Sequence, residues 1–130
     1  MRLLLVGAGY LGQAVAAVFR EAGWEVAAAS LHGGDGTLAC DVGDAESVAA
    51  LPRADAIVHC AASGRGGAEA YRHVYVEGCR NLATRFPGTP LLFTSSTSVY
   101  AQTDGSTVTE DSPAVPDRET GRLLLEAEAV

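Results

Sequence analysis

The chain of 130 residues has few basic side chains and few cysteines. Nine Lys and Arg stand against sixteen Asp and Glu, the net charge is −7, and the basic residues form no cluster. Nucleic acid, which binds through clustered cations, is therefore not an expected partner. The cysteines, Cys40, Cys60 and Cys79, form no Cys-x-x-Cys pair. Their odd number and spacing argue against a metal site and favour buried thiols in the reducing cytoplasm.

Long apolar runs are also missing. No stretch approaches the ~18 residues that span a bilayer, and the apolar start of the chain is interrupted by glycines at 7–12. We therefore expect no contact with a membrane and no secretion signal. Apolar residues nevertheless make up 48% of the chain and aromatic residues only 6%. This composition is typical of a single domain in which helices cover both faces of a sheet.

The most informative segment is the glycine pattern at residues 7–12. A short apolar run at 3–6 predicts a buried strand, and Gly7, Gly9 and Gly12 follow it with the spacing Gly-x-Gly-x-x-Gly. Gly7 would make the turn out of the strand. Gly9 would let the backbone approach a pyrophosphate, and Gly12 would let a helix lie close to the sheet.

A helix is predicted directly after this turn. Apolar residues from Leu11 to Ala22 recur at helical spacing, Gly23 ends the helix, and residues 25–30 predict a second strand. The helix start would direct its free N–H groups, with Tyr10 and Leu11 as its first residues, at the phosphates. A strand, helix and strand around this turn predict a dinucleotide site, and a purely structural glycine turn is the alternative.

Strands and helices alternate along the rest of the chain. We expect strands at 2–6, 25–30, 37–40, 55–60 and 90–95, and helices at 11–22, 44–50, 68–85 and from about 118 onward. The alternation predicts a three-layer α/β Rossmann fold, a doubly wound parallel sheet in the order 3-2-1-4-5. The aperiodic residues 97–117 predict a lid at the carboxyl ends of the strands.

Two features suggest that the chain stops before the fold does. The last helix runs to Val130 without a C-cap, and the strand at 90–95 would present an open apolar edge. If 130 residues are the whole protein, a homodimer would be a way to cover that edge.

Polar residues follow the second and third predicted strands, at the sheet edge where doubly wound folds bind ligands. Ser30 stands where an acidic residue would select NAD and a nearby Arg would select NADP, so the choice of cofactor stays open. Asp41 can accept from the adenine amino group, and the N–H of Val42 can reach a ring nitrogen. Alternatively Asp41 caps the next helix, although Asp44 fits that role better.

The fourth predicted strand ends in small residues. Ala61, Ala62 and Ser63 would leave room for the ribose and the pyrophosphate to pass over the strand end. His59, inside the apolar strand, is expected to be a core residue. Arg65, in the loop that follows, could reach a phosphate or an acidic substrate, or it could be solvated.

Hydroxyl side chains gather at the end of the fifth predicted strand, at residues 95–98. They would face the crevice where a nicotinamide lies, and Ser96 could hold a substrate carbonyl or hydroxyl. The alternative is that these hydroxyls bond to the backbone at the strand end.

The following segments together resemble a known family: Gly7–Gly12, Asp41–Val42, Val58–Ala62, Tyr75–Leu82, Phe93–Tyr100 and Glu110–Pro113. The chain resembles the extended and atypical branch of the short-chain dehydrogenase/reductase superfamily, in particular proteins described as NAD-dependent epimerase/dehydratase-like. The resemblance implies that residues 1–130 are an NAD(P)-binding Rossmann domain that precedes a C-terminal substrate domain. It also implies hydride transfer on a nucleotide sugar or another hydroxyl or carbonyl substrate.

By this resemblance Ser96 matches the catalytic Ser or Thr of the family. The family then expects Tyr-x-x-x-Lys, and here Thr120 stands at the Tyr position and Leu124 at the Lys position. A Thr hydroxyl is a far weaker acid than a tuned phenol, and Leu cannot bind the ribose hydroxyls. Two functions stay open: a hydride-transfer enzyme of this type, and a catalytically silent NAD(P)-binding sensor or partner module. S-adenosylmethionine and FAD are further alternatives, which the lack of an acid at Ser30 disfavours.

Overall fold

The computed structural model describes residues 1–64 and 66–130, so Arg65 and the phosphate contact predicted for it lie outside the described residues. The strands are β1 (Arg2–Val6), β2 (Glu25–Ser30), β3 (Leu38–Ala39), β4 (Ala56–His59) and β5 (Leu91–Phe93). The helices are α1 (Tyr10–Glu21), α2 (Ala45–Ala49), α3 (Gly67–Tyr71), η1 (Arg72–Glu77), α4 (Gly78–Arg85), η2 (Thr97–Val99) and α5 (Glu119–Glu128).

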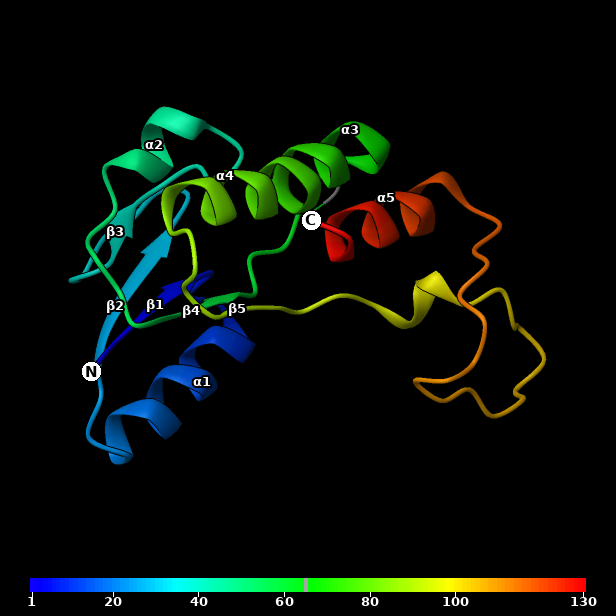
Figure 1. The fold of residues 1–130 in the computed structure, drawn as a ribbon, viewed down its shortest axis with the longest axis horizontal. Coiled ribbons are helices and arrows are strands. Elements are labelled where there is room, and N and C mark those ends of the chain that lie inside the picture. Colours follow the sequence, from blue (N-terminus) through cyan, green and yellow to red (C-terminus); the bar gives the residue numbers. More distant parts are fainter. Residues whose placement is uncertain (65) are drawn as a thin grey trace.

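The strands form one parallel sheet in the order β3-β2-β1-β4-β5, which confirms the predicted fold (Figure 1). β1 lies at the centre, where Leu4 pairs with Ala27 of β2 on one side and with Ile57 of β4 on the other. Because all strands are parallel, the loops that leave β1, β2, β3 and β4 meet at one edge of the sheet. The residues predicted to bind the dinucleotide lie in these loops, at the start of α1 and, for Ser30, at the last position of β2.

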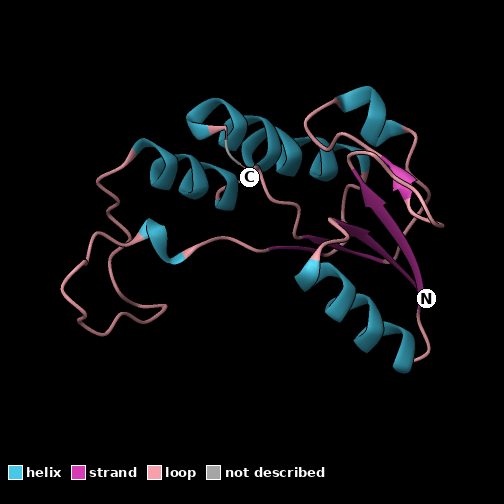
Figure 2. Ribbon diagram, turned by 180° about the vertical axis from the view of Figure 1, so that it is seen from behind, coloured by secondary structure: helices cyan, strands magenta, loops and turns pink. Residues whose placement is uncertain are grey.

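Helices cover both faces of the sheet. Figure 1 shows α1 on one face and α2, α3 and α4 on the other, with α5 beside α3 and beyond the strands, and Figure 2 shows the same layers from behind. Side chains of β1 alternate between the layers: Leu3 and Leu5 pack toward α1, whereas Leu4 and Val6 pack toward α2 and α4. All four are at most 2% exposed, and each such burial contributes about 1.5–3 kcal/mol to stability.

The elements differ from the prediction in detail. β3 has two residues, both exposed, because it lies at the edge of the sheet and pairs only with the end of β2. The helix predicted at 68–85 contains the π-helical segment η1. The wider turn of a π-helix cannot be recognised from the spacing of apolar residues. Residues 97–99, predicted as part of a loop, form the short 3-10 helix η2, which Ser96 begins by accepting a hydrogen bond from the N–H of Ser98.

Helix α5 packs on η1, α3 and η2. Leu123 and Ala127 are buried in a small cluster with Val76 and Cys79. At the surface, Glu126 forms ion pairs with two arginines, Arg72 of η1 at 3.2 Å and Arg80 of α4 at 3.3 Å.

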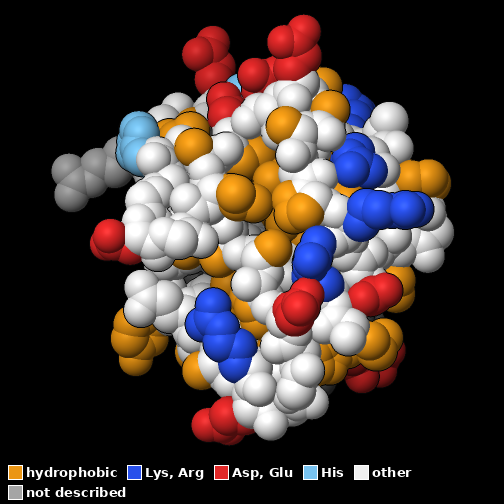
Figure 3. Space-filling model, turned by 90° about the vertical axis from the view of Figure 1, so that its left-hand side faces the viewer, with side chains coloured by type: hydrophobic (Ala, Val, Ile, Leu, Met, Phe, Trp, Pro, Cys, Tyr) orange, Lys and Arg blue, Asp and Glu red, His pale blue; other side chains and the backbone are white. Residues whose placement is uncertain are grey.

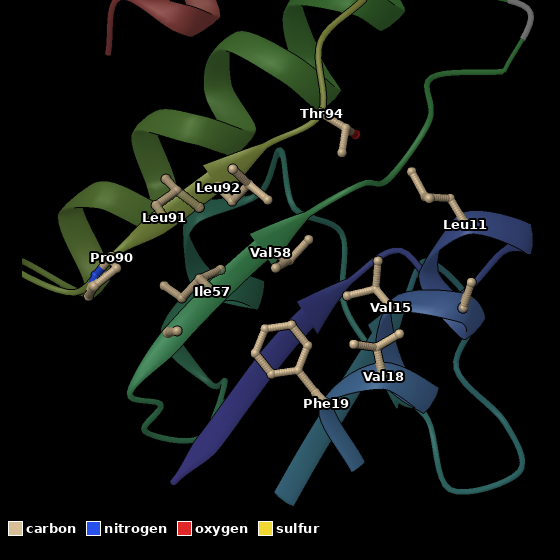
Figure 4. Close-up of a pocket in the computed structure, with 12 residues that line it drawn as sticks. Leu11, Val15, Val18, Phe19, Ile57, Val58, Pro90, Leu91, Leu92 and Thr94 are labelled. Carbon is tan, nitrogen blue, oxygen red and sulfur yellow. The ribbon is translucent and has the colours of Figure 1, made fainter. Parts of the chain in front are cut away.

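Beside α1 the sheet carries an open apolar groove of about 680 Å³. Figure 4 shows side chains of α1, β4 and β5 around it, among them Leu11, Val15, Phe19, Val58 and Leu92. Leu92 of the edge strand β5 is 63% exposed. The lining is apolar and holds none of the glycines of the turn after β1, so this groove is not the predicted nucleotide site.

The surface charges are mixed. On the face in Figure 3, basic side chains lie singly or in small groups beside acidic ones, with apolar surface near the centre. Within residues 1–64 and 66–130, no helix has both the length and the apolarity that a bilayer crossing requires.

Candidate nucleotide site

The turn after β1 brings two strands and a helix together. Gly7 has a φ of 103°, in the region that favours glycine, and its N–H donates to the carbonyl of Ala29 at 2.8 Å. A Cβ on Gly7 would lie 2.5 Å from the nitrogen of Ala61, and one on Gly12 would overlap the carbonyl oxygen of Gly7. Both positions therefore require the absence of a side chain for the fold itself.

Gly9 differs from these two glycines. It precedes α1 with φ −80° and ψ −154°, a backbone conformation open to any residue, and no atom lies within 4 Å of the place where its Cβ would be. The bare backbone at Gly9 therefore borders open space. The first N–H groups of α1, from Tyr10, Leu11 and Gly12, lack acceptors within the helix by their position. Together they offer an anion a cradle of donors at the positive end of the helix dipole.

A cavity of about 430 Å³ opens at the carboxyl ends of the strands; we call it the strand-end cavity. Seven of the residues predicted to bind the cofactor line it: Gly7, Ser30, Asp41, Val42, Ala61, Ala62 and Ser63. They come from the end of β2 and from the loops after β1, β3 and β4, so the fold gathers residues that are up to 56 positions apart in the sequence, the separation of Gly7 and Ser63. Their roles toward a cofactor stay predictions.

The remaining predicted residues lie beside this cavity. Gly9 and Ser30 line a more polar cavity of about 760 Å³ between α1 and the loop after β2, together with Arg20 and Asp35. The hydroxyl of Ser30 accepts from the N–H of Gly33 at 3.1 Å. Tyr10 is almost fully exposed, and Leu11 lines the apolar groove, so only their backbone groups are placed for the predicted role.

The structure shows that Asp41 is not the cap of α2, and its predicted contact with adenine stays a prediction. Asp44 caps α2 by accepting from the N–H of Glu46 at 3.1 Å, whereas Asp41 lies one turn earlier in the wall of the strand-end cavity. The N–H of Asp41 donates to the hydroxyl of Ser47, and the carbonyl of Val42 accepts from the side chain of Asn81. The backbone after β3 is thus fixed from both sides while the Asp41 carboxylate reaches the cavity wall.

His59 is a core residue, as predicted, and it also supports the site. Its ring is fully buried, Nε2 donates to the carbonyl of Val74 at 2.9 Å, and Nδ1 accepts from the N–H of Ala61 at 3.4 Å. Burial lowers the pKa of His59, against the opposing effect of the Val74 carbonyl. The neutral ring therefore ties the end of β4 to the π-helical segment.

The buried thiol of Cys79 has a pKa raised to about 11 by desolvation.

The sequence reasoning missed the contribution of η1 to the site. His73 lines the strand-end cavity, and its Nε2 lies 2.8 Å from Oδ1 and 3.0 Å from Oδ2 of Asp41. Two residues later, the hydroxyl of Tyr75 accepts from the N–H of Ser63 at 3.2 Å. One His and one Tyr in an amphipathic helix give no pattern signal, because their contacts are to residues that lie 12 and 32 positions away in the sequence.

The predicted catalytic residues lie elsewhere. Ser96 lines a separate hollow of about 430 Å³ with Tyr100, whose hydroxyl donates to the carbonyl of Thr109. Thr120 is half-buried near the start of α5 and is not among the residues that line this hollow. Leu124, at the Lys position, is 2% exposed. The structure therefore places Ser96 and Thr120 on adjoining elements without bringing them into one cavity.

No group of three or more His, Cys, Asp or Glu among the described residues is placed to hold a metal ion. The polar groups of the strand-end cavity are backbone groups, the hydroxyls of Ser30 and Ser63, the imidazole of His73 and the carboxylate of Asp41, which can only accept hydrogen bonds. This set suits a phosphorylated organic ligand.

Comparison with known proteins extends this picture. Residues 1–130 match the family described as RmlD substrate binding domain. Protein YeeZ of Escherichia coli strain K12 is 35% identical over 147 aligned positions, which include 98% of this chain and 52% of YeeZ. The chain spans about half the length of the curated relatives it matches.

Solved structures agree with this assignment. A short-chain dehydrogenase/reductase superfamily protein from Agrobacterium tumefaciens with bound NAD superposes with a TM-score of 0.81 at 26% identity, covering 99% of this chain and 43% of that one. The human epimerase family protein SDR39U1 with NADPH gives a TM-score of 0.75 at 25% identity, covering 99% of this chain and 48% of that one.

Proposed function

Because this chain belongs to the RmlD substrate binding domain family, among the NAD-dependent epimerase/dehydratase proteins of the short-chain dehydrogenase/reductase superfamily, we propose that residues 1–130 are its NAD(P)-binding domain. The observation that carries the proposal is the strand-end cavity, which gathers seven predicted cofactor residues beside an uncapped helix start. The binding of NAD and NADPH by the similar structures supports it.

In this proposal each group of predicted residues contacts a different part of the dinucleotide. The donors at the start of α1 would hold the pyrophosphate, and the bare backbone at Gly9 would allow it to come close. Asp41 and Val42 would contact the adenine, Ser30 the adenosine ribose, and the small residues 61–63 would let the chain of the cofactor pass over β4. Ser30 itself carries no charge that would exclude a 2′-phosphate, so its side chain does not select between NAD and NADP.

When bound, the nicotinamide supplies hydride acceptance or donation. For a reaction of this family, Ser96 would hold a hydroxyl or carbonyl of a substrate such as a nucleotide sugar. Thr120 and Leu124 do not supply the phenol and the ammonium that the family pattern expects, and the whole chain contains no lysine. This observation favours a second candidate function, a catalytically silent NAD(P)-binding sensor or partner module.

Gly9→Ala tests the site directly. The space around Gly9 accepts a methyl group in the folded protein, whereas a pyrophosphate on the same backbone would meet it. Isothermal titration with NAD⁺ and NADP⁺ should show saturable binding to the wild type and a loss of about tenfold or more for Gly9→Ala. Gly88→Ala, at a φ of +76° in a distant turn, should lower stability by about 1 kcal/mol and leave binding intact.

Binding of neither nucleotide by the wild type, or equal binding by Gly9→Ala, would refute the proposed site. Turnover assays with nucleotide sugars, ketones and aldehydes then separate the two candidate functions. Reduction or oxidation of the bound nicotinamide at a steady rate shows an enzyme, and binding without turnover over the same panel shows a silent module.

Association and location are proposals of the same kind. The open edge of β5, with Leu92 exposed, and the apolar groove beside it favour pairing with a second copy of this chain. Sedimentation velocity tests this, and a monomer at all micromolar concentrations contradicts it. The buried thiols of Cys40 and Cys79 are consistent with the reducing cytoplasm, where we place the protein.

A further inference from the structure

The wall of the strand-end cavity contains a contact that the proposed function does not use. His73 of η1 and Asp41 of the loop after β3 are 32 positions apart in the chain, and each is about half exposed. The imidazole Nε2 reaches both carboxylate oxygens, at 2.8 Å and 3.0 Å. Because a carboxylate only accepts hydrogen bonds, Nε2 carries the proton of this contact.

The hydrogen bonds of Asp41 leave one side of its carboxylate available. Oδ1 accepts twice, from the N–H of Gly43 at 3.0 Å and from His73. Within residues 1–64 and 66–130, Oδ2 accepts only the longer contact from His73. A carboxylate oxygen has two lone pairs, so Oδ2 keeps one acceptor position for a donor in the cavity that Asp41 lines.

Gly43 shows that the place of the imidazole is built into the fold. A Cβ on Gly43 would overlap the ring of His73, with Cδ2 and Cε1 only 2.5 Å away. The ring thus lies directly against the backbone that also donates to Asp41. His73 lies in the π-helical segment η1, and π-helical turns are frequent at functional sites.

We propose that His73 is a positioning residue for adenine recognition, holding the Asp41 carboxylate so that Oδ2 accepts from the 6-amino group. This inference rests on the proposed dinucleotide site and names the group that gives it base specificity. A base with a carbonyl at position 6, as in hypoxanthine, would bring oxygen against oxygen. His73 itself need not touch the base.

The test compares NAD⁺ with nicotinamide hypoxanthine dinucleotide, which differs at position 6 of the base, in titrations of the full chain. The wild type should prefer NAD⁺ by about tenfold or more, as a charged acceptor left facing an oxygen implies. Asp41→Asn, whose amide can also donate, should remove most of this preference.

His73 is tested by three changes. His73→Leu removes the donor and should reduce the preference to about threefold or less, whereas His73→Gln keeps an N–H near the Nε2 position and should largely restore it. Gly43→Ala leaves the imidazole in the chain but displaces it, and should act like His73→Leu. His32→Leu, at an exposed histidine of the loop after β2, is the matched control and should keep the wild-type preference.

The outcomes are distinguishable. If neither dinucleotide binds the wild type, the proposed function fails and this inference with it. If NAD⁺ binds but the wild type shows no preference, or if His73→Leu and Gly43→Ala keep the full preference while folded by circular dichroism, the inference alone is overturned. Loss of preference in both variants with rescue by Gln supports it, since a merely structural role of His73 would weaken both ligands equally.

Discussion

We expect His59 to lower the free energy of unfolding as the pH falls, and a substitution of His59 should remove this effect. The ring is fully buried, and desolvation lowers its pKa in the folded state. The unfolded chain therefore binds a proton at a higher pH than the folded chain does. Stability is fully present above the ordinary pKa of about 6.5 and is lost as the pH falls below it.

The loss of stability is largest if only the unfolded chain binds the proton, so the ordinary pKa of histidine sets its upper limit. If His59 stays neutral throughout in the folded state, protonation of the unfolded chain between about pH 7.5 and about pH 5.5 removes about 1.4 kcal/mol. His59→Gln does not titrate, and its amide N–H can still donate to the carbonyl of Val74. The variant should lack this part of the pH dependence while losing about 1–3 kcal/mol overall from poorer hydrogen bonding and packing.

Urea unfolding followed by circular dichroism at both pH values measures the effect. The difference in the free energy of unfolding between the two pH values should be larger for the wild type than for His59→Gln. His32→Gln, which changes an exposed histidine, controls for general effects of removing an imidazole. Equal pH dependence in the wild type and His59→Gln would show that the pKa of His59 is the same in the folded and unfolded chain, and the reasoning would be wrong.

Three further predictions concern helix α5 and the core. Leu124→Lys places an ammonium at a position 2% exposed and should destabilise the fold by about 3–5 kcal/mol in urea unfolding, and an unchanged midpoint would contradict the burial. Glu126→Gln removes the ion pairs to Arg72 and Arg80, all partly exposed, so it should cost at most about 1 kcal/mol at low salt and almost nothing at molar salt. Cys79, with its pKa raised to about 11 by burial, should resist thiol reagents near neutral pH until urea unfolds the chain, and rapid modification of native Cys79 in a mass-spectrometric assay would rule this out.

The order of the elements followed from patterns that are local in the sequence. Gly7 and Gly12 are fixed by contacts within one turn and its neighbouring strand, so their spacing carries the information needed to predict them. The parallel order then follows from the alternation of strands and helices and from the handedness of crossovers. The capping of α2 by Asp44 was predictable for the same reason, because a cap acts within one turn.

The parts that could not be predicted depend on contacts between distant segments. The π-helical segment η1 has a wider turn than an α-helix. Within it, the carbonyl of Val74 accepts a hydrogen bond from His59 of β4, a residue 15 positions earlier in the sequence. His73 therefore reaches Asp41 only after the sheet and the helix have packed together. Likewise, the length of β3 is limited by its place at the sheet edge and not by its residues, which have ordinary strand character.

The strand-end cavity and the separate hollow at Ser96 differ in how many hydrogen bonds hold their polar side chains in place. In the strand-end cavity, the Asp41 carboxylate accepts hydrogen bonds from the N–H of Gly43 and from His73. The hydroxyl of Tyr75 accepts a further one from the N–H of Ser63. In the separate hollow, the only side-chain hydrogen bond of Ser96 within the described residues is accepted from Ser98, two positions away, which fixes a turn and not a substrate. Preorganised groups contribute binding energy without the entropy of ordering them. Under the proposed function, we therefore expect the ordered groups around Asp41 to contribute more to nucleotide affinity than Ser96 does.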